Sequence, residues 1–136
     1  MSVVKIRIAL ETALAAMTPA ISISYENAAF QSTTGVPYQS PFLMVATPDN
    51  SVIGNGYYRE QGIFQITLAY PIQQGTSPSI SRAVLIQQTF ARGNVFANGG
   101  VNVRIMKTAE IGQGVIDDDR WRVPVKIRWT AEIFAP

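Results

Sequence analysis

The stretch VPVKIRWTAEIF, residues 123–134, alternates between apolar and polar residues over most of its length. Successive side chains of an extended strand point to opposite faces, so Ile127, Trp129 and Ile133 share one face. Lys126, Arg128 and their alternate neighbours share the other. We therefore predict a long strand that buries Trp129 and leaves its polar face in water.

A second stretch, GIFQITLAYPI at residues 62–72, has the same pattern. Phe64, Ile66, Leu68 and Tyr70 fall on one side, and polar or small residues separate them. These two segments are expected to form the main strands of one sheet.

Two helices are predicted to cover that sheet. Residues 2–17 end in an alanine-rich run of strong helix formers that stops at Thr18-Pro19. Residues 79–92 follow Ser77-Pro78, a typical helix start, and precede Gly93, a typical stop. Helical spacing places one set of residues of the second helix on its buried face: Ile80, Ala83, Val84, Gln87, Phe90 and Ala91.

The remaining segments read as short strands and connections. We predict strands at 21–25 and within 41–48, loops at 26–40 and 49–61, a hairpin at 94–106 turning at Asn98-Gly99, and a polar connection at 107–122. The expected fold is a single α+β domain over residues 1–136, with a mostly antiparallel β-sheet and two helices packed on one face.

The composition excludes several classes of chemistry. Among 136 residues there is no cysteine and no histidine, which removes disulfides, thiolate metal sites and the usual catalytic bases. The net charge of +2 is small, so we expect no direct contact with nucleic acid. No apolar run is long enough for a membrane span, and we expect no contact with a membrane.

No motif indicates catalytic, cofactor-binding or metal-binding residues. Asp117, Asp118 and Asp119 are consecutive, whereas a calcium loop places its ligands at alternating positions, so a solvated turn is favoured. The glycines form no phosphate-binding pattern. A hydrolase that works with carboxylates alone is disfavoured, because no pair of acids sits in a recognisable frame.

Two polar and aromatic segments are candidate interfaces between proteins. Aromatic residues and arginine are enriched in interface hot spots, and both segments contain them: Tyr57, Tyr58 and Arg59 in one predicted loop, and Asp117, Asp118, Asp119, Arg120 and Trp121 in another. The first segment is equally well explained as a hairpin end whose tyrosines lie over the edge of the sheet. Lys126, Arg128 and Arg104 are predicted to form a positive stripe on the solvated sheet face. The stripe is either simply hydrated or contacts an acidic partner.

Taken whole, the chain resembles a family of short proteins from tailed bacteriophages and prophages that are similar to tail terminator proteins. The resemblance rests on the order of five segments along nearly the full length: IRIALETALAAM, FLMVATP, GYYREQGIFQITLAYP, FARGNVFANGGVNVRIM and VPVKIRWTAEIF. None of these is a chemical motif.

The resemblance implies a structural tail protein without catalysis or cofactor. It implies a ring, usually hexameric, that closes the head-proximal end of the tail tube and contacts the tail-tube protein and a head-connector protein. Such a protein is assembled in the host bacterial cytoplasm and stays in the virion tail. A small host binding module with no enzymatic activity is the alternative.

Overall fold

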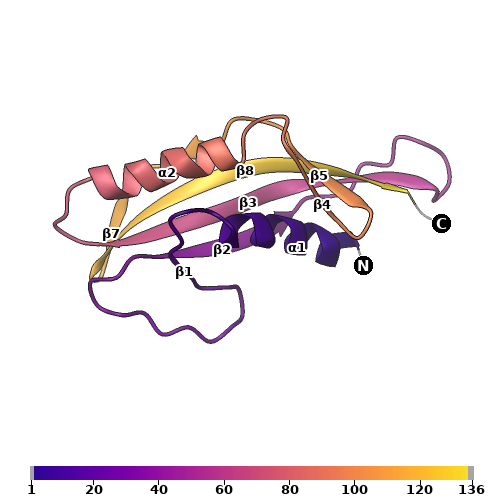
Figure 1. Ribbon diagram of the computed structural model, residues 1–136. Helices are drawn as coiled ribbons and strands as arrows, with labels where there is room; N and C mark the ends of the chain where they lie inside the picture. The colour runs from indigo at the N-terminus through magenta and orange to yellow at the C-terminus, as the bar shows by residue number, and fades with distance from the viewer. Residues whose placement is uncertain (1, 135–136) are drawn as a thin grey trace.

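Two long strands form the axis of the fold (Figure 1). The computed structural model describes residues 2–134. In it β3 (Tyr57–Pro71) and β8 (Arg120–Phe134) pair antiparallel over their whole lengths. Each strand has 15 residues, so this β3–β8 ribbon is roughly 45 Å long. The two predicted main strands are confirmed, and both begin earlier than predicted.

Shorter strands extend the sheet on both sides of the ribbon. The sheet has the order β1-β2-β3-β8-β5-β4. The short strands β6 and β7 pair with the part of β8 that precedes its pairing with β5. Every pairing is antiparallel except that of β1 with β2. The bounds of these strands are Ser22–Ile23 for β1, Tyr38–Val45 for β2, Val95–Asn98 for β4, Val101–Ile105 for β5, Glu110–Ile111 for β6 and Val115–Asp117 for β7.

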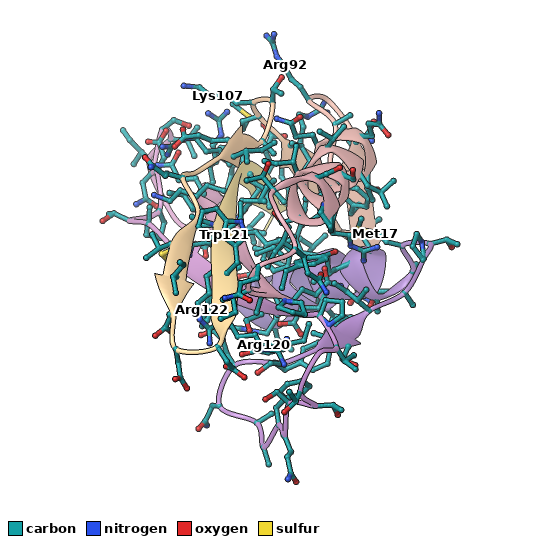
Figure 2. All side chains as sticks on the ribbon, turned by 90° about the vertical axis from the view of Figure 1, so that its left-hand side faces the viewer. Met17, Arg92, Lys107, Arg120, Trp121 and Arg122 are labelled. Atoms are coloured by element: carbon teal, nitrogen blue, oxygen red, sulfur yellow. The ribbon has the colours of Figure 1, made fainter. Side chains whose placement is uncertain are left out.

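Both helices lie on the same face of this sheet. Helix α1 spans Ser2–Ala15 and helix α2 spans Ser77–Thr89, and their buried residues join one hydrophobic core with the odd-numbered side of β8. In Figure 2 the two helices lie on one side of the strands, and no helix covers the other side within residues 2–134. The predicted α+β class, with two helices on a mostly antiparallel sheet, is confirmed.

The buried face of the ribbon is the face that the alternation predicts. Trp129 is only 1% exposed, and its indole lies against Gly62, its partner in the register of the two strands. A Cβ at Gly62 would approach the indole to 3.0 Å and overlap the carbonyl oxygen of Met44. Gly62 therefore interrupts the hydrophobic pattern of β3 because the Met44 carbonyl, and next to it the Trp129 ring, occupy the space of a side chain.

The predicted buried face of α2 is only partly correct, since Ala83 and the C-cap residue Phe90 are buried as predicted. Ile80 and Val84 are exposed, whereas Ser79, Arg82 and Ile86 face the core. Arg82 donates a hydrogen bond to the carbonyl of Pro19, beyond the end of α1, and burial lowers its pKa. The inward face thus includes polar residues that contact backbone, which a hydrophobic pattern cannot detect. In α1 the residues Ile6, Leu10 and Leu14 are buried at helical spacing, whereas Val3 is exposed.

Two predicted turns also differ in detail. The hairpin of β4 and β5 turns at Gly99-Gly100, with positive φ at both residues, and Asn98 already pairs with Val101. The predicted connection at 107–122 contains β6, β7 and the start of β8. This edge of the sheet is therefore more continuous than the polar composition of the segment suggests.

Candidate functional site

The residues predicted to form interfaces lie at the two opposite ends of the β3–β8 ribbon. One end, here called the loop end, comprises residues 57–59 of β3 and 132–134 of β8, where Tyr57 pairs with Phe134. The other, here called the hairpin end, comprises residues 115–122, where β7 turns into β8 and Asp117 pairs with Arg120. The two groups thus do not form one site.

At the hairpin end, Arg120 is part of the interior. Its side chain is 3% exposed. Its two terminal nitrogens donate to the carbonyls of Val36 and Thr33, at 2.6 and 2.8 Å, and its guanidinium lies 5.0 Å from the centre of the Tyr38 ring. Arg120 therefore holds the loop before β2 against the hairpin, and its charge is not available to a partner.

Trp121 and Arg122 continue this anchoring on the two faces of β8 (Figure 2). The half-buried Trp121 ring lies against Gly114, where any side chain would overlap it. Arg122 donates to the carboxylate of Asp117 at 2.8 Å and to the hydroxyl of Tyr38 at 3.1 Å. Burial by itself would lower the pKa of Arg122, but these two hydrogen bonds raise it.

The turn of the hairpin is the exposed part of this end. Asp118 has a positive φ of 58° and, within residues 2–134, no ion pair. Asp119 is exposed, and its cationic partner among the described residues is the buried Arg120, 4.0 Å away. Val115 and Ile116, in the adjacent β7, are 61% and 66% exposed. The surface offered here is an acidic turn beside two apolar side chains.

At the loop end, the three predicted residues belong to a strand and not to a loop. Tyr57 donates to Glu132 at 3.2 Å and its ring packs on Phe134, with 5.2 Å between the ring centres. The hydroxyl of Tyr58 points to the helix side, 3.3 Å from the hydroxyl oxygen of Ser2 in α1. Arg59 lies on the uncovered sheet face and forms an ion pair with Glu132 at 3.6 Å.

Beside Arg59, the uncovered face is hollowed by two adjoining depressions of about 430 and 310 Å³. We call them together the cationic groove, because within residues 2–134 four cationic side chains and one carboxylate, that of Glu132, line them. The four are Arg59, Arg104, Lys107 and Arg128. Apolar side chains of Val95, Met106 and Phe134 also line it.

The sequence indicated part of this groove, since Arg104 and Arg128 belong to the predicted positive stripe. Lys126, the third residue of that stripe, lies opposite Glu110 in the register of β6 and β8 and does not line the groove. The position of Arg59 in the groove was not predicted, because residues 49–61 were expected to form a loop and β3 begins within them, at Tyr57.

The structure also bears on cofactor and membrane sites. Within residues 2–134, no group of three or more acidic residues is arranged to hold a metal ion. Neither α1 nor α2 is long and apolar enough to cross a membrane.

Comparisons with known proteins agree with this architecture. Residues 5–129 match a family described as phage tail terminator protein. Twelve chains of known structure are similar to this chain. One of them, whose name states no function, is 26% identical, with a TM-score of 0.76 over 96% of this chain and 95% of that chain. No curated protein matches the sequence.

Proposed function

This chain belongs to the family of phage tail terminator proteins, and we propose that it forms a ring at the head-proximal end of a tail tube. In this proposal its role is structural. The ring would contact the tail-tube protein on one side and a head-connector protein on the other, and six copies would close it.

The observation that carries the proposal is the position of the two candidate surfaces. A ring needs a head-to-tail contact, in which one surface of a subunit meets a different surface of the next, and the rotation between them closes the circle. The hairpin end and the loop end differ in composition and lie at opposite ends of the β3–β8 ribbon, which is paired over its whole length. Such a subunit can contact two neighbours at once without the two contacts overlapping.

The low charge of the chain supports an assembled role. Only 15% of its residues are charged, whereas about a quarter is typical. The uncovered sheet face and the exposed apolar side chains at both ribbon ends supply surface for neighbours. We expect each contact to be weak, so that isolated subunits stay mostly monomeric and a ring forms when a tube end brings them together. Assembly would take place in the host cytoplasm, and the ring would remain in the virion tail.

The test is removal of the gene from its phage or prophage, followed by complementation with the full chain. We expect cells without the gene to produce tails of abnormal length that are not joined to heads, and the chain to restore normal particles. Electron microscopy of tagged particles should find the chain as a ring at the head-proximal tube end. Normal tails without the gene would contradict the proposal and favour a binding module that acts outside the virion.

A further inference from the structure

We infer that the acidic turn of one subunit, Asp118-Asp119, docks into the cationic groove of the next. The inference rests on the proposed ring and specifies its contact: a second copy of this chain, joined head to tail through opposite charges and flanking apolar side chains. It replaces the broader predicted surfaces, since Arg120 and Tyr58 are engaged within their own subunit.

The two surfaces carry opposite charges, and several of these charged side chains form no ion pair within their own chain. In residues 2–134, Arg104, Lys107 and Arg128 form no ion pair, and neither does Asp118. The side-chain nitrogen Nε of Arg59 is buried beside the groove with no hydrogen-bond partner among those residues. Desolvated ion pairs across an interface favour one register and exclude partners of the wrong charge.

The apolar parts of the two surfaces also correspond. Val115 and Ile116 project beside the acidic turn, and Met106, Val95 and Phe134 are exposed at the groove. A charged centre with apolar neighbours would give the contact both specificity and buried apolar area. A hairpin turn is a projecting feature and the groove is a recess, so their shapes suit this arrangement.

A subunit cannot make this contact with itself. The turn precedes Arg120 at one end of β8, and Arg104 pairs with Thr130 close to the other end. Ten residues of strand separate the two pairing positions, roughly 33 Å. Any bond between Asp118 and Arg104 must therefore join two copies.

Because the natural chain has no cysteine, disulfide trapping can test the contact directly. The variant carries Asp118→Cys and Arg104→Cys in one full-length chain, and the tails that it completes in cells are purified and oxidised. We expect a ladder of linked subunits that extends beyond the dimer on a non-reducing gel. Either substitution alone should give at least tenfold less linked product, because the facing position of the neighbour then has no thiol. A disulfide forms only between cysteines whose Cα atoms lie within about 7 Å of each other.

A matched control combines Asp118→Cys with Gln88→Cys, an exposed position of α2 on the helix side. It should give no ladder. If both double variants complete normal tails and neither forms a ladder, the docking contact is overturned while the ring proposal stands. If the unsubstituted chain itself is absent from tails, the proposed function is contradicted, and the docking contact with it.

A charge exchange covers the case in which the cysteine variant does not enter tails. Asp118→Lys and Arg104→Glu should each reduce the yield of complete particles at least tenfold, and their combination in one chain should restore it. Additive losses would overturn the inference. A second result would also overturn it: no ladder forms, the unsubstituted chain binds duplex DNA, and Arg104→Glu abolishes that binding. The groove would then bind nucleic acid.

Discussion

The two ends of the β3–β8 ribbon contain similar residue types but use them differently. At the hairpin end, Arg120 is buried and bonded to the backbone of another segment. At the loop end, Arg59 lies at the surface with one ion pair of 3.6 Å to an exposed glutamate. Two arginines in two aromatic segments thus have opposite roles, one in holding the chain together and one in presenting charge.

This difference has a physical basis in what surrounds each arginine. The backbone of residues 33–36 passes over the hairpin end and offers carbonyl acceptors, which compensate the loss of water around Arg120. Charge-assisted hydrogen bonds of this kind are among the stronger ones in proteins. At the loop end the neighbouring strands leave the groove uncovered, so Arg59 keeps contact with solvent.

The largest expected effect is a difference in stability loss between substitutions of the two tryptophans of β8. Trp129→Ala should lower the free energy of unfolding by about 3 to 5 kcal/mol, because it leaves a large cavity in a fully packed region. Trp121→Ala should cost clearly less, since the Trp121 ring is only half-buried at the hairpin end. Urea unfolding followed by circular dichroism measures both. Equal losses would show that packing along the ribbon is uniform and would remove this part of the comparison.

A smaller effect is expected from Arg120→Met, which keeps much of the side-chain volume. It removes two charge-assisted hydrogen bonds, and each such bond contributes about 1.5 to 3 kcal/mol. Since the freed carbonyls lie in an exposed loop and can bind water, we expect a net loss of about 2 kcal/mol. Hydrogen exchange of residues 33–36 should accelerate, while the core of β3 stays protected.

Arg92→Met, at an exposed arginine, is the control. It should change neither the free energy of unfolding nor the hydrogen exchange of residues 33–36. Unchanged exchange at residues 33–36 in Arg120→Met would mean that other contacts hold this loop.

How far the fold was predictable differs between these regions. The buried face of β8 follows from alternation alone, because a strand with one wet face repeats every second residue. The early start of β3 was not predictable, since Gly54, Asn55 and Gly56 indicate a turn and no local signal shows where pairing resumes. The partner strand β8 decides it, through the pairing of Tyr57 with Phe134.

The sequence predicted which residue types form the candidate surfaces, but not where these residues lie in the fold. Aromatic, arginine and acidic residues marked both ends of the ribbon. The burial of Arg120 depends on carbonyls more than eighty residues away in sequence, at Thr33 and Val36. The groove depends on β5 lying beside β8, which places Arg104 opposite Thr130. Long-range pairings of this kind leave no trace in the pattern of a single segment.

The smallest effect tests whether the surface ion pair at the hairpin end contributes to its rigidity. Asp117→Asn removes the 2.8 Å pair with Arg122, whose partners are 65% and 32% exposed. We expect a loss of at most about 0.5 kcal/mol, because exposed ion pairs are well solvated on both sides. Arg122 also keeps its hydrogen bond to Tyr38 and the contact of its guanidinium with that ring, at 5.8 Å from the centroid.

A double-mutant cycle of Asp117→Asn with Tyr38→Phe isolates the remaining coupling. The loss from Asp117→Asn should shrink further in 1 M salt, where the screening length falls to about 3 Å. It should grow when Tyr38→Phe removes the second partner, since Asp117 then alone orients Arg122. A loss above about 1.5 kcal/mol that persists in high salt would mean that Asp117 acts like Arg120, as an anchor within the subunit.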